Sequence, residues 1–191
     1  RLGADRIYDL AAQCVLRESL RSPSTAVRSR MQKWWRHAMK VSAISRVLAR
    51  MSERFDPDHA ATIGLLHSIA EPVMLFHADR HPDLEDATLL ENVMFGNRAE
   101  LGRILMSFWG LPRTLVQAAG ASTSWQYQHA GEADYVDIML VAQWHAAIGG
   151  DRRHLLPQLD TLPAAEKLGL VNPSPKLSLK IVEAANNAVG R

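Results

Sequence analysis

Two histidines stand on the apolar faces of different predicted helices, so both are expected to point into the protein. His37 lies in the apolar stripe of one helix, and His67 lies in that of the next. Inward histidines from facing helices are how a helical bundle builds a metal site. A metal that activates water for phosphoester attack needs about three or more protein ligands, carboxylates among them. The alternative for each histidine is a hydrogen-bonded core residue.

The elements that position these histidines are predicted to be helices, because the apolar periodicity is helical nearly throughout. No segment alternates with period two, which predicts an all-α fold. Gly96 and Asn97 are expected to separate two helices, and residues 77–86 and 120–132 are expected to be loops. The expected helices cover residues 5–20, 24–54, 57–70, 72–76, 87–95, 101–108, 112–119, 136–147 and 177–189.

Aromatic and apolar residues at helical spacing indicate the expected core. Trp34 and Trp109 are predicted to be core residues. The helix at 101–108 carries a predicted apolar face at i, i+3, i+4 and i+7. Trp125 and Tyr127 fall in the polar 120–132 loop, where either a contact surface or packing against the core is open. The apolar face consists of Leu101, Ile104, Leu105 and Phe108.

Charge is distributed unevenly along the 191 residues, although the net charge is only +2. Residues 1–54 carry 12 Lys/Arg against 4 Asp/Glu, giving +8, and residues 55–191 carry 10 against 16, giving −6. Arg46, Arg50 and Arg54 would line one helix face at i, i+4 and i+8. This face is predicted to be solvated or paired with acidic residues, with an anionic partner as the alternative.

The remaining composition indicates a globular protein without a membrane span. Apolar residues make up 47% of the chain, and charged or polar residues interrupt every apolar run before a bilayer could be crossed. The chain opens on Arg1 with no basic-then-apolar signal pattern. The single Cys14 is expected to be a small core residue and fits a reducing cytoplasm.

A series of short motifs resembles the HDOD domain family, whose members are divergent relatives of the HD and HD-GYP phosphohydrolases. The resemblance covers residues 1–150 and implies an HD-like multi-helix bundle there, with residues 151–191 as a C-terminal helical extension. It also implies that the family's N-terminal helical lobe is missing from this chain, so the native protein is expected to be longer, or the chain to be an unusual short version. The motifs, in order, are Trp35-Arg36-His37, Gly64-Leu65-Leu66-His67-Ser68-Ile69-Ala70, Glu91, Gly96, Arg98-Ala99-Glu100-Leu101-Gly102 and Trp109-Gly110-Leu111-Pro112.

The resemblance allows the metal ligands of active HD enzymes to be checked position by position. His37 matches the first histidine, and His67 matches the histidine of the HD pair. Ser68 stands in place of the aspartate of that pair, and Arg98 stands where a further histidine is expected. Gln143 stands where the final aspartate would come. No carboxylate remains at either aspartate position, and Arg98 adds a cation that disfavours a metal.

Two further positions depart from the active pattern. Residues 119–122 read Ala-Gly-Ala-Ser where a pair of histidines is expected, and Glu71 replaces the lysine of HD-GYP enzymes. No catalytic, metal-binding or cofactor-binding residue is therefore predicted. His37 and His67 are regarded as vestigial, and are expected to form a packed polar cluster with Gln143.

The function implied by the resemblance is a non-catalytic regulatory or scaffold domain of bacterial signal transduction. Such domains occur around cyclic di-GMP signalling and are expected to act in the cytoplasm by binding a protein partner, with a homodimer left open. One alternative is a metal-dependent phosphohydrolase or phosphodiesterase with atypical ligands, Glu71 being a candidate. Another is the binding of a nucleotide or nucleic acid through the basic N-terminal half, although nucleic acid is the less expected partner.

Overall fold

The computed structural model describes residues 24–80, 87–148 and 153–189. Every regular element in these ranges is helical, which confirms the predicted all-α fold. The helix predicted over residues 5–20 lies outside the described residues. The α-helices are α2 (Thr25–Ala49), α3 (Pro57–Leu66), α4 (Ala70–Ala78), α5 (Ala87–Phe108), α6 (Arg113–Ala121), α7 (Tyr135–Ala147), α8 (Pro163–Lys167) and α9 (Pro175–Val189), and two short 3₁₀ helices are η2 (Arg153–Leu155) and η3 (Leu159–Thr161).

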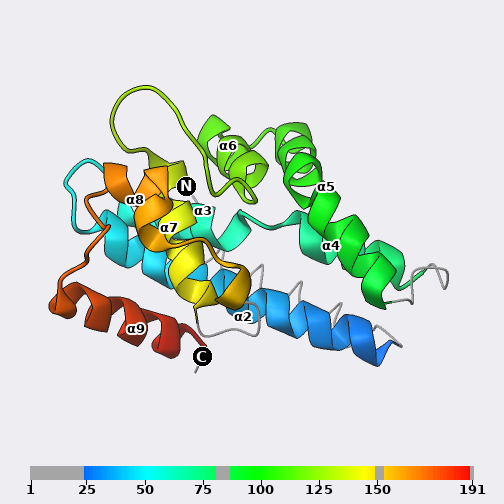
Figure 1. The fold of residues 1–191 in the computed structure, drawn as a ribbon. Coiled ribbons are helices and arrows are strands. Elements are labelled where there is room, and N and C mark those ends of the chain that lie inside the picture. The colour runs from blue at the N-terminus through cyan, green and yellow to red at the C-terminus, as the bar shows by residue number, and fades with distance from the viewer. Residues whose placement is uncertain (1–23, 81–86, 149–152, 190–191) are drawn as a thin grey trace.

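The long helix α2 is the axis of the molecule, and the other helices pack around its two halves. Figure 1 shows α4 and α5 beside its N-terminal half and α7, α8 and α9 around its C-terminal half. Two clusters of buried apolar residues follow this division. Trp34 belongs to the cluster at the N-terminal half, and Val41 belongs to the larger cluster at the C-terminal half. His37 lies between them on α2.

Polar caps start the helices where the sequence offers them. The Ser24 side chain accepts a hydrogen bond from the backbone N–H of Val27 (3.3 Å) at the start of α2. The Asp56 side chain accepts one from the N–H of Asp58 (2.9 Å) at the start of α3, where Pro57 occupies the first turn. Each cap satisfies N–H groups that the helix itself leaves unpaired.

The predicted break at Gly96 is wrong, because α5 continues through it from Ala87 to Phe108. Gly96 is exposed, and a Cβ added there would meet no atom within 4 Å. An exposed glycine costs a helix only about 1 kcal/mol, which the packing of the rest of α5 offsets. The residue therefore weakens the helix without ending it.

The predicted apolar face of α5 is mostly exposed to solvent. Ile104 is 49% exposed and Phe108 is 84% exposed. The side of α5 that faces α6 instead carries Gly102 and Met106, which are buried. Of the two tryptophans predicted to be core, Trp34 is buried, whereas Trp109 is 49% exposed, so the prediction for Trp109 is wrong.

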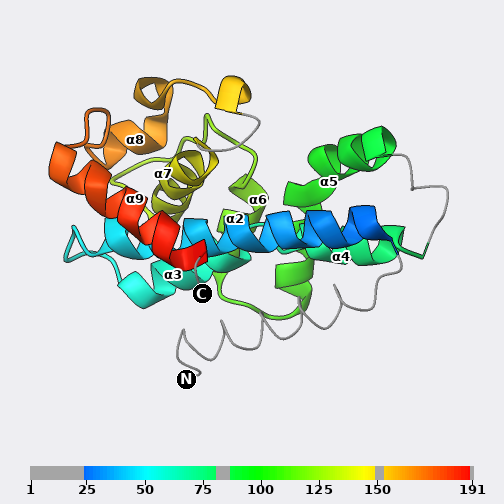
Figure 2. The ribbon, with the colours of Figure 1, turned by 90° about the horizontal axis from the view of Figure 1, so that it is seen from below.

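The C-terminal residues pack onto the same bundle. Figure 2 shows α9 crossing the C-terminal half of α2, and its Leu177 and Ile181 are buried in the larger core cluster. The predicted boundary between residues 1–150 and 151–191 stays a prediction. Within the described ranges, no helix combines the length and the apolar character that crossing a bilayer requires.

Candidate functional site

The two histidines singled out by the sequence meet in the interior. His37 projects from α2, and His67 is the residue that caps the C-terminus of α3. Their ring centroids lie 5.7 Å apart with an angle of 62° between the planes. Gly64 makes this approach possible, since a Cβ there would stand 2.9 Å from the Ser42 Cα and from the Val41 carbonyl oxygen of α2. The small residue lets the backbones of α2 and α3 touch.

Both imidazoles are held in the neutral form. The Nδ1 of His67 lies 2.7 Å from the Gly64 carbonyl oxygen, which can only accept, so this nitrogen carries the hydrogen. Burial lowers the pKa of His67 to about 3, helped by the neighbouring His37 and Arg98 charges. Burial also lowers the pKa of His37 to about 4, with Arg98 and Lys40 contributing. Neutral imidazole is the form that ligates a metal, so protonation does not exclude one.

Ser68, which stands in place of the HD aspartate, serves a different purpose. Its Oγ and its carbonyl oxygen lie 2.9 Å and 3.1 Å from the indole Nε1 of Trp34, which donates to both. Ser68 and Trp34 are both buried. This position therefore fixes a core tryptophan, as a buried indole N–H requires an acceptor.

Arg98 places a permanent positive charge beside the histidine pair. Its charge contributes to the lowered pKa of both imidazoles. Its Nη1 donates to the Glu71 Oε1 at 3.0 Å, and about a quarter or less of each side chain is exposed. Glu71, the one carboxylate considered as an atypical ligand, is thus engaged by a cation. A metal at the histidines would face the same guanidinium.

Of the expected cluster of His37, His67 and Gln143, the two imidazoles lie together, and the place of Gln143 in the cluster stays a prediction. Gln143 is buried on α7, but its Oε1 has no hydrogen-bond partner among the described residues. That oxygen therefore does not bridge the imidazoles. The 119–122 segment supplies core packing instead of ligands, with Ala119 and Ala121 buried in the larger cluster.

These residues do not fit the metal centre of an active HD phosphohydrolase. Two neutral imidazoles remain, the aspartate position is a serine bonded to Trp34, and the nearby carboxylate is paired with Arg98. Metal sites that activate water need additional, preferably anionic, ligands. This position therefore does not supply the ligand set of a hydrolytic metal centre.

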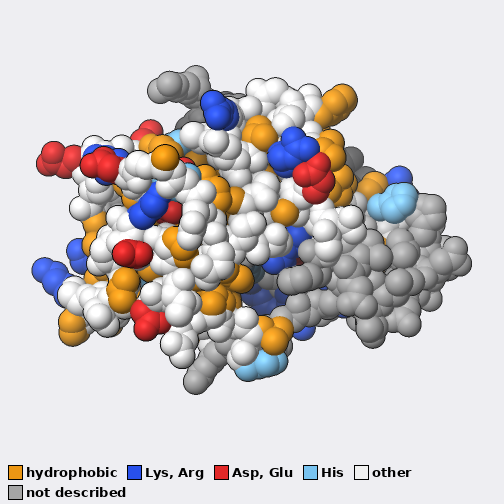
Figure 3. Space-filling view, turned by 45° about the horizontal axis from the view of Figure 1, so that its top comes forward, with side chains coloured by type: hydrophobic (Ala, Val, Ile, Leu, Met, Phe, Trp, Pro, Cys, Tyr) orange, Lys and Arg blue, Asp and Glu red, His pale blue; other side chains and the backbone are white. Residues whose placement is uncertain are grey.

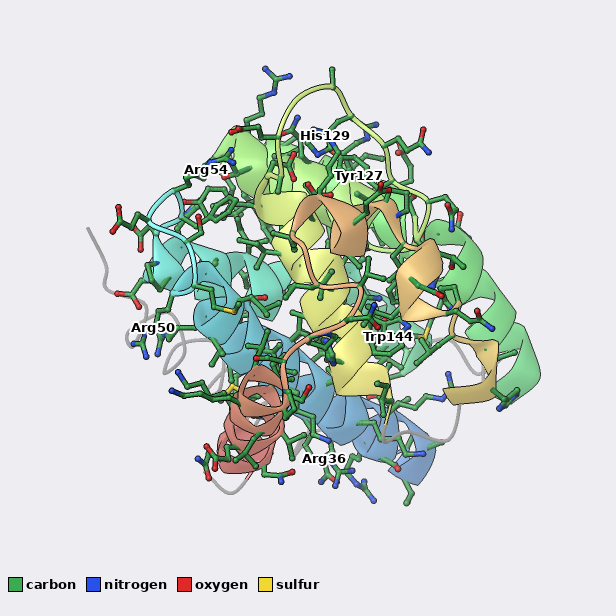
Figure 4. The ribbon with its side chains drawn as sticks, turned by 60° about the vertical axis from the view of Figure 1, so that its left-hand side comes forward. Arg36, Arg50, Arg54, Tyr127, His129 and Trp144 are labelled. Atoms are coloured by element: carbon green, nitrogen blue, oxygen red, sulfur yellow. The ribbon has the colours of Figure 1, made fainter. Side chains whose placement is uncertain are left out.

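The predicted helix face of Arg46, Arg50 and Arg54 is wrong in extent, because α2 ends at Ala49 and Arg54 lies beyond it, and two of the three arginines pair with acidic residues of the same chain. Arg46 pairs with Asp58 (3.1 Å), and Arg54 pairs with Glu132 (2.7 Å), while Arg50 is exposed. Figure 4 shows Arg50 and Arg36 pointing outward at separate places. On the face drawn in Figure 3, basic and acidic side chains are interspersed. This arrangement favours the predicted solvated and paired face over an anion-binding one.

The aromatic residues of the loop before α7 contribute more to the core than to the surface. Trp125 and Tyr127 are both partly buried and pack against the larger core cluster. Of the two alternatives predicted for them, a contact surface or packing against the core, the structure favours packing. More exposed aromatic side chains lie at the end of α5, where Phe108 is 84% and Trp109 is 49% exposed.

The family assignment agrees with this geometry. The HDOD domain model matches residues 1–125, about two thirds of the chain. The chain belongs to the HDOD domain family. A comparison with curated proteins and a comparison with solved structures each found no match.

A second group of polar residues was missed by reading the sequence. His129, Asp134 and Asp137 converge where the loop after α6 meets α7, with one potential ligand atom from each lying within 4.8 Å of the others. The signal available in the sequence was the Asp-x-x-Asp spacing before the apolar run of α7, which is typical of a capping box. Nothing in the spacing indicates that His129 would reach the same point.

Proposed function

We propose that this domain is a non-catalytic regulatory or scaffold module of bacterial signal transduction that acts in the cytoplasm by binding a protein. The observation that carries the proposal is the replacement of the HD ligand set by the Arg98–Glu71 ion pair and the Ser68–Trp34 hydrogen bond. At the position where an active HD enzyme holds its metal, these side chains bind to one another. Membership of the HDOD family is compatible with this role, and a pathway that uses cyclic di-GMP is the setting the family suggests.

An exposed apolar patch supports binding to a protein. We call it the α5 patch, and it consists of Ile104, Phe108 and Trp109, which are 49%, 84% and 49% exposed. Ile104 and Phe108 are one helical turn apart, and Trp109 follows directly. Large apolar side chains gathered in solvent mark interaction sites, and aromatic residues commonly anchor interfaces.

The alternatives are supported less well. A phosphohydrolase would need carboxylates at the histidine pair, and Glu71 is held by Arg98. Binding of nucleotide or nucleic acid through Arg46, Arg50 and Arg54 would have to break two ion pairs with Asp58 and Glu132. Steep weakening with added salt would support that second alternative.

Replacing Phe108 and Trp109 together by serine is expected to weaken partner binding by about 30-fold or more, because buried aromatic anchors contribute about 2 kcal/mol or more. The measurement is quantitative affinity capture with the purified chain, followed by titration of the captured protein. Since both side chains are exposed, the melting temperature should hardly change. Light scattering on the same variant shows whether a second copy of this chain is the partner.

The matched control is Leu179→Ser with Val182→Ser, which removes two exposed apolar side chains from α9. This variant should bind the partner with unchanged affinity. Unchanged binding by the α5 variant, or equal loss in the α9 control, would contradict the assignment of the α5 patch. Metal-dependent hydrolysis of a phosphodiester that is abolished by His67→Gln would contradict the non-catalytic function itself.

A further inference from the structure

The loop that follows α6 and the first turn of α7 bring three potential metal ligands together. Asp134 caps α7, and its Oδ1 accepts from the N–H groups of Val136 (2.7 Å) and Asp137 (3.1 Å). Asp137 completes the capping box, since its Oδ2 accepts from the N–H of Asp134 (2.9 Å). The backbone of α7 thus orients both carboxylates, and the Oδ2 of Asp134 accepts from the Tyr127 hydroxyl of the loop at 3.4 Å.

His129 faces these carboxylates through a defined ring nitrogen. Its Nδ1 lies 3.1 Å from the Ala130 carbonyl oxygen, which can only accept, so Nδ1 carries a hydrogen. Its Nε2 donates to the Oδ2 of Asp137 at 2.8 Å and lies 3.8 Å from the Oδ2 of Asp134, and the hydrogen bond to Asp137 raises the pKa of His129. Histidine ligands of metals are commonly oriented in this way, with the second ring nitrogen donating to a carbonyl. Figure 4 shows His129 and Tyr127 together at this end of α7, away from Trp144.

The two distances between the imidazole nitrogen and the carboxylate oxygens suit a single small cation. Two ligand atoms that each lie about 2.0–2.1 Å from one ion, at angles of about 90–130°, are about 2.8–3.8 Å apart. The two distances from the His129 Nε2 fall in this range. One imidazole and two carboxylates suit a divalent transition metal such as Zn²⁺.

A buried oxygen of Asp137 points to a cation independently of the spacing. Asp137 is 0% exposed, and its Oδ1 has no hydrogen-bond partner among the described residues. A buried carboxylate oxygen that nothing donates to is costly. Its other oxygen already lies against His129, so the unpaired oxygen belongs to a carboxylate directed at the group.

We propose that His129, Asp134 and Asp137 bind one divalent transition-metal ion, with Zn²⁺ as the best match. Binding replaces the hydrogen bond from the Nε2 of His129 to Asp137 by a bond from this nitrogen to the metal, and the proton of Nε2 is released to solvent. The Nζ of Lys167 donates to the His129 carbonyl oxygen (2.6 Å), which holds the loop in place although its charge offsets part of the carboxylate charge. With three protein ligands, coordination positions stay open for water or for a partner's side chain.

The test is isothermal titration of the chelator-treated, dialysed protein with Zn²⁺, with elemental analysis for stoichiometry. The expected result is one Zn²⁺ per chain. Asp134→Ser keeps a helix cap and His129→Gln removes the imidazole, and each should weaken binding roughly tenfold or more. His154→Gln, which removes an exposed histidine in η2, should leave binding unchanged. Circular dichroism shows that each variant is folded.

Three outcomes would overturn the site. Absence of Zn²⁺ binding would show that His129 and Asp137 form an ion pair only. Binding that survives both Asp134→Ser and His129→Gln would place the ion elsewhere. Binding lost on His67→Gln instead would overturn this site and also count against the non-catalytic function, whereas failure at His129 alone leaves that function untouched.

Discussion

Replacing Gly64 by alanine is expected to lower the free energy of unfolding by about 2–3 kcal/mol and the melting temperature by about 4–12 °C. The new Cβ would lie 2.8 Å from the Ser45 Oγ and 2.9 Å from two backbone atoms, the Ser42 Cα and the Val41 carbonyl oxygen. Backbone atoms cannot move aside as a flexible side chain can. Helices α2 and α3 must therefore separate, although alanine itself favours the helical state.

Gly96→Ala is the matched control, because Gly96 is also helical but a Cβ there meets no atom within 4 Å. It should raise stability by about 0.5–1 kcal/mol. Urea unfolding and thermal melting of both variants measure the difference. A Gly64→Ala protein as stable as the parent would show that the close contact of α2 with α3, which brings His37 to His67, is wrong.

Acid is expected to destabilise the protein through the histidine pair, of which His67 is buried and His37 is partly buried. The pKa of His67 is lowered from 6.5 to about 3 and that of His37 to about 4. Between these values and 6.5 the unfolded chain binds protons that the folded chain does not, so stability is full above 6.5 and falls as the pH decreases. The limiting slope is about 1.4 kcal/mol per pH unit for each histidine. From about pH 6.5 to about pH 4.5 the pair should lower the free energy of unfolding by roughly 4–5 kcal/mol.

Urea unfolding at several pH values measures this loss, and histidine variants assign it. His67→Gln should remove about half of the slope, whatever its effect on stability at neutral pH. His154→Gln removes an exposed histidine and should leave the slope unchanged. Equal slopes in the parent, His67→Gln and His37→Gln would mean that the pair is not buried in the neutral form.

The sequence was sufficient for most of the helices and for the inward faces of the two histidines, because both depend on local periodicity, but α8 and the continuity of α5 through Gly96 were not predicted. Apolar residues three and four apart predict a helix wherever it packs, and the caps at Ser24 and Asp56 define two starts. His37 and His67 belong to inward faces of successive helices, which pack together in the structure.

Periodicity could not show which face of α5 is covered. Ile104 and Phe108 have the spacing of a buried face, but the neighbouring helix α6 packs on the side of Gly102. Trp109 follows the end of the helix, where helical spacing no longer applies. Glycine is a residue type that often ends helices. At Gly96, however, the free-energy cost of one exposed glycine is smaller than the stabilisation that the rest of the helix provides.

The group at His129 could not be predicted for a different reason. Asp134 and Asp137 serve as a capping box, and that local purpose fully accounts for their spacing. His129 joins them only through the path of the loop, which packing of Trp125 and Tyr127 and the contact from Lys167 determine. Such a convergence depends on tertiary structure, not on sequence spacing.

The loss of the HD metal centre is tested most directly by following the side-chain nitrogens of His37 and His67 by ¹H–¹⁵N NMR while Zn²⁺ is added. The pair lies beside Arg98 and lacks a free carboxylate, so both histidine signals are expected to stay in place, even if Zn²⁺ moves the His129 signal. A stoichiometric shift of the His37 and His67 signals would show that the HD metal centre survives, and would contradict the proposed non-catalytic function.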